Sequence, residues 1–290
     1  MSFEFICLGT GCPVATPERM GPAHLVIADD TKILIDCGSG VTQRLVQAGT
    51  RGADLDALIV THYHSDHVID FWQLIVSSWH QGRTKPWRVI ATAPAITHMQ
   101  KQIESFGDEI KLRIAHEHRP STEGLRVMFE ELGEHTLTFP HLTITPFAVD
   151  HRPVTPAFGL IFESSGRKLV FSGDTAPCDT LSHAARDADL LVQEVFVDRE
   201  MQPIPGVRSA DTVASVMAYH TTPAQAAALA TGSRVRALML THIVPPAADR
   251  SALLREIRVG YAGPAIIGED LMRFDVVNRM IRAGQTILAL

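Results

Sequence analysis

The chain has 290 residues, 46% of them hydrophobic, so it can bury a large core in one domain or two. Its 26 basic and 32 acidic residues give a net charge of −6, and no Lys/Arg block stands out. This composition argues against a surface built mainly to grip nucleic acid. The start of the chain lacks a signal-peptide pattern, and no run approaches the roughly 20 apolar residues of a membrane span. We therefore expect a cytoplasmic protein without a membrane partner.

Apolar runs typical of β-strands alternate with helical patterns along the chain. Strands are expected at residues 3–8, 32–35, 58–60, 88–91, 142–146, 160–163, 168–171, 190–192 and 237–240. Helices are expected at residues 40–48, 66–78, 93–102, 177–185, 222–230 and 250–260. Several strands are apolar at nearly every position, which favours burial on both faces and predicts an α/β fold. No low-complexity or Pro/Gly/Ser-rich linker interrupts the pattern, so we predict a single domain over residues 1–290.

The most informative segment is Thr61–His67, which directly follows the apolar run at 57–60. It places three imidazoles and one carboxylate in six residues, spaced His-x-His-x-Asp-His. Zinc, manganese and iron prefer these ligand types. A loop that leaves a buried strand can aim alternate side chains at one point, so the segment predicts ligands for two adjacent metals. The alternative is a solvated, His-rich turn.

Further ligands are needed, because four donors in one loop cannot close two metal sites. The segment at 57–62, ALIVTH, is echoed at 237–242 by ALMLTH, which suggests two related halves that each deliver a histidine. His242 ends the second copy, and His151 and Asp174 also stand just beyond strand-like runs. Gly173 permits a sharp turn that exposes the Asp174 carboxylate. Each residue alone is more typical of a structural role, but together they supply the missing donors.

Together these segments resemble the metallo-β-lactamase superfamily, and most closely its ribonuclease Z and aryl-sulfatase-like phosphodiesterase branch. Similar stretches to that branch occur at residues 8–11, at Arg19 and 21–22, and at 34–38, 220–227 and 268–272. The resemblance covers nearly the whole chain. It implies a four-layered αβ/βα sandwich with two pseudo-twofold-related halves and with ligands in loops along one edge. The branch often dimerises, which is the only reason to expect a homodimer.

The resemblance also implies how the ligands divide between two divalent ions. One ion would be held by His62, His64 and His151, the other by Asp66, His67 and His242, and Asp174 would bridge both. Zinc is expected from the ligand types, with manganese and iron as alternatives.

The expected chemistry follows from such a centre. Two divalent ions about 3.5–4 Å apart can share a water and lower its pKa enough to hold hydroxide near neutrality. This predicts hydrolysis of a small, anionic ester by a metal-bridging hydroxide, with a phosphodiester as the leading substrate and a lactone or aryl sulfate as alternatives. Asp66 is expected both to bind a metal and to orient or deprotonate the attacking water.

Two further residues are expected to assist catalysis. His220 stands just before Thr222–Gln225, which has the form of a capping box at a helix start. In the resembled branch the matching histidine assists catalysis, and a glutamate matching Glu194 supports it. The alternatives are a histidine in a turn and a carboxylate with no catalytic role.

The chain departs from tRNA-processing members of the branch, which carry a long arm that grips tRNA. In bacterial forms this arm lies between the positions matching His151 and Asp174, where this chain has only residues 152–173, 22 in number. We therefore expect tRNA 3′ processing and nucleic-acid partners to be absent.

A non-hydrolytic redox or metal-binding role is the other alternative. Redox members usually have a carboxylate in place of one motif histidine and a fused flavin domain, and this chain shows neither.

Several residues outside the ligand set are expected to line or cover the pocket. The aromatic and apolar candidates are Trp72, Trp79, Phe158, Phe196 and Met201, and His80 is a further candidate. A loop at 195–213 is expected to cover the centre, and the residues expected to favour an anionic substrate are Arg152, Arg199 and Arg208. His24 and Cys37 are expected to be structural, with a pocket role and a metal role as their alternatives. Residues 116–118 are expected to form a polar loop or strand without a metal.

Overall fold

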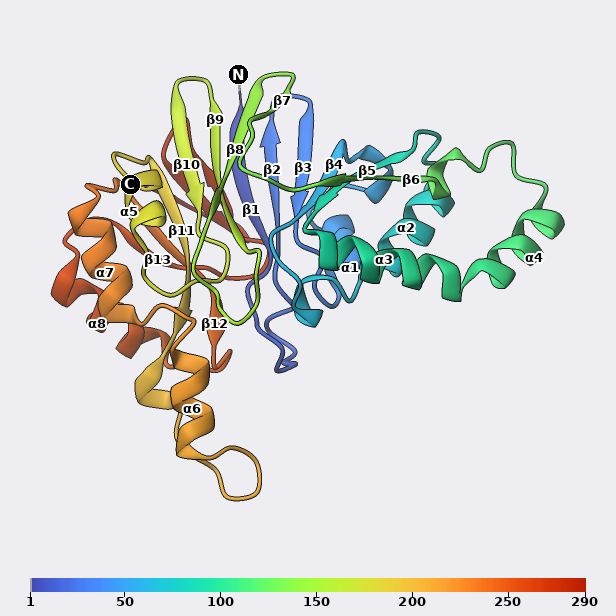
Figure 1. Ribbon diagram of the computed structural model, residues 1–290. Coiled ribbons are helices and arrows are strands. Elements are labelled where there is room, and N and C mark those ends of the chain that lie inside the picture. Colours follow the sequence, from blue (N-terminus) through green and yellow to red (C-terminus); the bar gives the residue numbers. More distant parts are fainter. Residues whose placement is uncertain (1) are drawn as a thin grey trace.

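Two β-sheets packed face to face form the centre of the molecule, with helices on both outer sides (Figure 1). The computed structural model describes residues 2–290. The first sheet has nine strands in the order β16-β15-β14-β1-β2-β3-β4-β5-β6, and the second has seven in the order β13-β12-β11-β10-β9-β8-β7. Neighbouring strands β3 to β6 run parallel, as do β10 to β13.

The bounds of the elements are as follows. The first sheet contains β1 (Phe3–Gly9), β2 (Ala23–Ala28), β3 (Thr31–Ile35), β4 (Ala57–Val60), β5 (Trp87–Ala91), β6 (Val127–Glu131), β14 (Arg273–Asp275), β15 (Met280–Ala283) and β16 (Thr286–Ala289). The second contains β7 (Leu137–Phe139), β8 (Leu142–Ala148), β9 (Phe158–Ser164), β10 (Arg167–Phe171), β11 (Leu190–Phe196), β12 (Leu238–Val244) and β13 (Ala265–Ile267). The helices are α1 (Val41–Gln47), α2 (Phe71–His80), α3 (Ala93–Ser105), α4 (Gly107–Glu117), α5 (Asp179–Ala184), α6 (Ala210–Met217), α7 (Pro223–Gly232) and α8 (Arg250–Gly260).

Alternation along the buried strands explains the layers. In β4, Ala57 and Ile59 pack between the sheets, whereas Leu58 and Val60 pack under the helices. In β12, Met239 faces the other sheet, and Leu238 and Leu240 face α7 and α8. Because both faces of these strands are covered, every position of β4 and the first three positions of β12 are apolar. The two strands that carry the sequence echo are thus both inner strands, one in each sheet, which agrees with the prediction of two related halves.

Two predicted elements differ from the structure near the site. Residues 66–78 do not form one helix: Ser65–His67 make a single 3-10 turn, and α2 begins only at Phe71. Because this turn is separate from α2, the side chains of Asp66 and His67 can both point toward the other predicted ligands. The predicted loop at 195–213 is also only partly correct, since β11 continues to Phe196 and α6 begins at Ala210, capped by Ser209.

The prediction of a loop or strand at 116–118 is wrong. His116 and Glu117 end α4, which continues the arm begun by α3 (Figure 1). None of the α4 residues, all of which the structure describes, is buried. Arg113 pairs with Glu109 and Glu117 one turn away on either side, and such pairs stabilise an exposed helix. Sequence periodicity failed here because α4 has no buried apolar face.

Among residues 2–290, no helix combines the length and the apolar character that crossing a membrane requires.

Candidate metal centre

Every predicted ligand lies at the edge of the sandwich where the parallel strands end. The loop after β4 supplies His62, His64, Asp66 and His67, while His151 follows β8 and Asp174 follows β10. Because the carboxyl ends of parallel strands meet at one edge, residues far apart in sequence converge there. Gly173 has a φ of +61°, and a Cβ there would lie 2.5 Å from the Phe158 carbonyl oxygen, so this turn requires glycine.

His242 reaches the centre through a β-bulge. The register of β11 against β12 shifts between Glu194 and Val195, leaving His242 as the extra residue, with a φ of +41°. A bulge bends the strand and re-aims a side chain. The strained backbone therefore turns this imidazole toward the centre.

The first ligand group brings three imidazoles to one point. Nδ1 of His64 lies 3.1 Å from Nε2 of His62 and 3.1 Å from Nε2 of His151. With an Asp174 oxygen, the donor atoms of these residues all lie within 4.8 Å of one another.

The second group shares Asp174 with the first. Asp66, His67 and His242 offer donor atoms within the same 4.8 Å span, and His242 Nε2 lies 3.3 Å from Asp66 Oδ2. Oδ2 of Asp174 lies 3.2 Å from Nε2 of His242 and 3.5 Å from Nε2 of His67. The same oxygen is 3.9 Å from Nε2 of His62 in the first group. Asp174 thus stands between the two groups, where the predicted bridging ligand belongs.

The outer nitrogens of three of these histidines contact fixed protein groups. His67 Nδ1 lies 2.8 Å from Oδ2 of the buried Asp36, and His151 Nδ1 lies 3.0 Å from the Tyr219 carbonyl oxygen. His62 Nδ1 lies 3.1 Å from the Thr61 hydroxyl. Such contacts fix ring orientation and leave the inner nitrogen free to bind a metal. The inner Nε2 of His67 is buried without a hydrogen-bond partner among the described residues.

The electrostatics of the two groups differ. Burial lowers the pKa of His62 well below its ordinary value, and burial and the nearby His151 lower that of His64 to about 4, so both favour the neutral form that binds metals. At His242, burial is outweighed by the carboxylates of Asp174 and Asp66, which raise its pKa to about 9. Burial likewise opposes a charged His67, yet Asp174, Asp36 and Asp66 raise its pKa well above the usual range.

The donor set therefore fits two divalent cations. Five imidazoles and two carboxylates converge, an imidazole nitrogen lacks a partner, and buried cationic charge is favoured next to Asp174. The structure brings together all seven residues that the sequence predicted, although their roles as ligands stay a prediction.

His220 and Glu194 form a pair beside the centre. His220 Nδ1 lies 3.2 Å from Glu194 Oε2, and both side chains are buried. The backbone N–H of Thr221 donates to Glu194 Oε1 at 2.8 Å, which fixes the carboxylate, and burial raises the pKa of Glu194. A donor atom of His220 lies within 4.8 Å of donor atoms of Asp174 and His242, so the pair borders the second group.

A pocket of about 290 Å³ opens over the centre. Its lining comes from the centre itself, the N-terminal loop, α6 and the residues after it, and β12: Cys12, Pro13, Val14, His64, Ser65, Asp66, Asp174, Val216, Tyr219, His220, His242 and Val244. Three larger hollows, of about 650, 490 and 360 Å³, lie at the hairpin ends of β7–β10, between α5 and α7, and at residues 204–212, and none of them contains a predicted ligand.

The three arginines predicted to favour an anionic substrate do not line this pocket. Arg152 pairs with Asp150, and its side chain is 79% exposed. Arg199 pairs with Glu200 and Glu256, while Arg208 donates to the Gln202 carbonyl oxygen. Each guanidinium is engaged elsewhere, so the prediction is wrong for all three.

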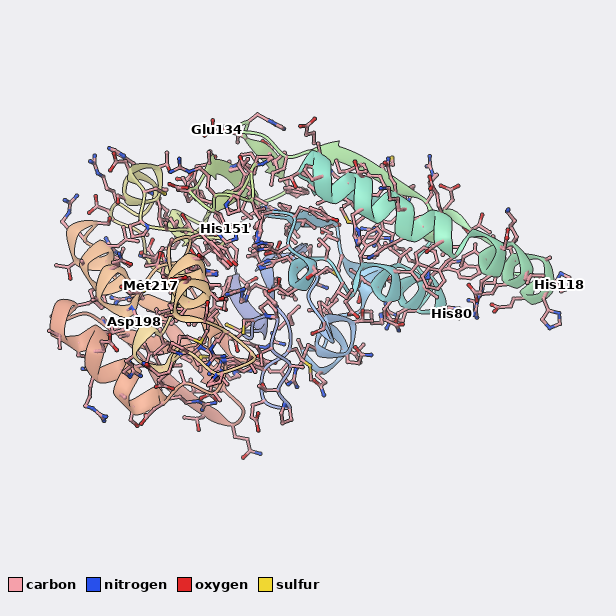
Figure 2. The ribbon with its side chains drawn as sticks, turned by 60° about the horizontal axis from the view of Figure 1, so that its bottom comes forward. His80, His118, Glu134, His151, Asp198 and Met217 are labelled. Carbon is pink, nitrogen blue, oxygen red and sulfur yellow. The ribbon has the colours of Figure 1, made fainter. Side chains whose placement is uncertain are left out.

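Four other predicted pocket residues also lie elsewhere. Trp72 stacks on Phe106 at 5.1 Å, and the Trp79 indole donates to the Ser121 carbonyl oxygen. Both tryptophans therefore pack against the α3–α4 segment and the residues that follow it. His80 is the last residue of α2 and contacts Arg119, and Figure 2 shows it far from His151. Phe158 is buried in the core between the sheets.

Two predicted aromatic or apolar residues do support the pocket from behind. Phe196 stacks on His220 with a centroid separation of 6.1 Å and packs with Cys12 and Val244, which line the pocket. Met201 packs against this same cluster. Both therefore hold the lining in place without belonging to it.

The structural roles expected for His24 and Cys37 agree with the structure. His24 is buried on β2, stacks on Phe5 at 4.9 Å and contacts the Thr241 hydroxyl at 3.2 Å. Burial lowers the pKa of His24 to about 3, so it is neutral. Cys37 packs in the core under the helices, and burial raises its thiol pKa well above the usual range.

Sequence reasoning missed two functional residues. Asp36 follows the predicted strand at 32–35, as the ligands follow their strands, and that position was the signal that could have found it. Tyr219 lines the pocket and orients His151 through its carbonyl group, and its only signal was its place beside His220.

Comparison with known proteins decides the family. A family model described as "Beta-lactamase superfamily domain" matches residues 31–243. The chain belongs to the β-lactamase superfamily. A curated ribonuclease Z of Mycobacterium bovis (strain BCG / Pasteur 1173P2) is 34% identical to it over 285 residues, covering 95% of this chain and 99% of that protein.

Solved structures agree with the superfamily fold. The metallo-β-lactamase fold protein YhfI from Bacillus subtilis is similar with a TM-score of 0.75 at 19% identity, covering 95% of this chain and 100% of that one. The short form of human tRNase Z gives a TM-score of 0.67 at 20% identity, covering 94% and 99%. A diphosphatase from the PhnP family gives 0.64 at 16% identity, covering 94% and 97%. At these identities the likeness shows the fold alone, and it confirms the predicted metallo-β-lactamase sandwich.

As a member of this superfamily with curated ribonuclease Z relatives, the chain is a metal-dependent hydrolase. The superfamily fold implies divalent metal ions, and the His/Asp groups of this chain offer the donors for them.

Proposed function

We propose that this chain is a dinuclear, metal-dependent phosphodiesterase. His62, His64 and His151 would hold one ion, Asp66, His67 and His242 the other, with Asp174 between them. We propose zinc as the metal, because it binds imidazole nitrogens and carboxylate oxygens well; manganese and iron also bind such ligands. The observation that carries the phosphodiester assignment is the His220–Glu194 pair beside this donor set.

When bound, two such ions supply a Lewis acid and a water of lowered pKa. The protein residues do the remaining work. The 3.2 Å contact between His220 Nδ1 and Glu194 leaves the other ring nitrogen, Nε2, for the pocket that His220 lines. From there Nε2 would donate a proton to the departing ester oxygen. Asp66, also in the lining, would orient the attacking water.

Glu194 is positioned for this role by its surroundings. Its Oε1 accepts from the backbone N–H groups of Thr221 at 2.8 Å and Thr175 at 3.3 Å, so the carboxylate cannot turn away. A carboxylate fixed beside Nδ1 orients the His220 ring and would select the tautomer that carries a proton on Nδ1, which leaves Nε2 on the pocket side for proton transfer.

A substrate panel on metal-analysed protein tests the proposal. The panel contains bis(4-nitrophenyl) phosphate, a cyclic nucleotide, an aryl sulfate and lactones. We expect the diester to be hydrolysed fastest, and we expect chelation or His151→Ala to abolish turnover. His141→Ala, which alters an exposed histidine away from the centre, is the matched control and should be unchanged. Diesterase activity that survives both chelation and His151→Ala would overturn the mechanism, and faster turnover of a lactone or sulfate would replace the substrate class.

RNA 3′ processing is the second candidate, because the curated relative at 34% identity is named ribonuclease Z. The alignment covers 99% of that relative, so the absence of a long arm does not separate this chain from it. The pocket argues in the other direction, since none of its described lining residues is Lys or Arg. Gel retardation of precursor tRNA together with clean 3′ cleavage at low enzyme concentration would favour RNA over a small diester.

A further inference from the structure

Apolar side chains from two segments form walls of the metal pocket. The N-terminal loop contributes Pro13 and Val14, and α6 contributes Val216, with Tyr219 just beyond the helix. Val14 is 60% exposed although it lies over a centre of charged groups. Val216 packs against a small apolar cluster of Cys12, Phe196 and Val244, so its position is fixed by packing.

Fixed positive charge is missing from these walls. None of the described residues that line the pocket is Lys or Arg. The nearby Arg19 is 4% exposed and donates to the Thr10 hydroxyl and to the Gly268 and Pro246 carbonyl oxygens, so it faces the interior. An anion entering the pocket would therefore meet positive charge only at the floor, where the proposed ions would outweigh the carboxylates of Asp66 and Asp174.

This distribution of charge distinguishes among phosphate esters. A phosphodiester has one negative charge, which the floor can accept, and two ester substituents that must lie along the walls. A phosphomonoester carries a second negative charge, and an RNA strand carries neighbouring phosphates that would lie against the uncharged walls. Anionic groups placed on apolar surface lose hydration without gaining a partner, which is unfavourable.

The small size of the pocket also favours a small phosphodiester over an RNA strand. A volume of about 290 Å³ is at the lower end of ligand sites, which run from about 300 to 1,000 Å³. The ring of Tyr219 packs edge-on against His151, with their centroids 5.0 Å apart and an interplanar angle of 89°. Its remaining surface offers a flat apolar contact of the kind that aromatic groups prefer.

We infer that the substrate is a small phosphodiester with at least one apolar or aromatic ester substituent, which lies between Val14 and Val216 against Tyr219. This inference rests on the proposed phosphodiesterase function and specifies its substrate class. The walls would select for apolar substituents, and the floor would select for a single negative charge.

Binding of two non-hydrolysable analogues tests the inference. Diphenylphosphinate and dimethylphosphinate have the same single charge and the same two oxygens, and differ only in apolar surface. On metal-loaded protein, calorimetry should show diphenylphosphinate binding at least about tenfold more tightly, because each buried carbon contributes hydrophobic free energy. The ratio of kcat/KM for phenyl 4-nitrophenyl phosphate over methyl 4-nitrophenyl phosphate, which share a leaving group, should move in the same direction.

Matched variants assign the effect to the walls. Val14→Thr and Val216→Thr keep the side-chain shape but put a hydroxyl in place of a methyl group, and each should reduce the diphenyl/dimethyl ratio by about fivefold to tenfold. Val207→Thr makes the same change at a 74% exposed position outside the pocket and should leave the ratio unchanged. All three variants retain β-branching, and the melting temperature of each variant shows whether a change in the ratio comes from a loss of folding.

The outcomes separate this inference from the proposed function. Metal-loaded protein that hydrolyses no phosphodiester would refute the proposed function. Diester hydrolysis with a diphenyl/dimethyl ratio near one, or with equal ratios in all variants, would overturn only the apolar-substituent inference. Faster turnover of 4-nitrophenyl phosphate or of RNA than of the aryl diester would do the same.

Discussion

Asp36→Asn should lower the metal affinity of one of the two sites, although it replaces none of the predicted ligands. The buried Asp36 carboxylate accepts from the Thr61 backbone N–H at 2.8 Å and from its hydroxyl at 3.0 Å, and Oδ2 lies 2.8 Å from His67 Nδ1. Asparagine keeps one oxygen for Thr61 but presents an NH₂ group to His67. Two donors cannot face each other, so His67 must move its proton to Nε2, the nitrogen that a metal needs.

The expected loss follows from that single contact. A hydrogen bond to a charged group contributes about 1.5–3 kcal/mol, and removing an outer partner of a metal ligand lowers metal affinity about 10- to 100-fold. Asp36 has a φ of +58°, which asparagine tolerates, so the backbone should not add strain. Competition with a chelator at pH 7.5 would measure both affinities. We expect the ion held with His67 to weaken and the other to be retained.

Asp187→Asn is the matched control, because Asp187 is exposed and its carboxylate pairs with Arg234 on the surface. It should bind both ions normally. If Asp36→Asn also retained two ions at unchanged affinity, the argument that Asp36 sets the His67 tautomer would be refuted.

The remaining predictions concern catalysis, acid stability and metal removal. His220→Ala and Glu194→Gln should each lower kcat by about 10²–10⁴ with bound metal unchanged; loss of metal, or an unchanged kcat, would contradict the roles given to them. The folded pKa of His24 is about 3 against an ordinary 6.5, so between these values the unfolded chain binds a proton that the folded chain does not. Stability should therefore fall as pH decreases below 6.5, by about 1.4 kcal/mol per pH unit from this residue, and denaturant unfolding of chelated His24→Leu should show a shallower dependence. Chelation should lower the melting temperature and added zinc should restore it in a concentration-dependent way, since the ligands converge only in the folded chain; equal melting temperatures would count against a metal centre here.

The sequence predicted the parts of the molecule that local pattern controls. The inner strands β4 and β12 are apolar at every position before their threonines because both of their faces are covered, so their runs could be identified without the structure. The donors that follow such strands were found because parallel strands end at one edge. Spacing alone made His62, His64, Asp66 and His67 recognisable, and the fold placed His151, Asp174 and His242 beside them.

Other features depend on packing between distant segments, which the sequence does not display. Asp36 contacts His67 only because β3 lies next to β4 in the sheet. Arg152 could have lined the pocket, but its side chain pairs with Asp150 and points into solvent, and nothing in the local sequence distinguishes the two cases.

The helix α4 was missed for a related reason, whereas α3 before it was predicted at residues 93–102. The apolar residues of α4 have no core to face, so the helix shows no clear amphipathic pattern. Trp72 was assigned to the pocket because it follows the ligand loop, whereas α2 carries it away from the centre to stack on Phe106.

The central claim is that two divalent ions, held in part by a shared Asp174, are needed for hydrolysis of a phosphodiester. Titrating metal-free protein with zinc or manganese while following bis(4-nitrophenyl) phosphate hydrolysis tests it directly. We predict that activity saturates at two ions per chain and that Asp174→Ala neither binds two ions nor turns over the diester. Full activity in protein shown by elemental analysis to be metal-free, or in Asp174→Ala, would contradict it.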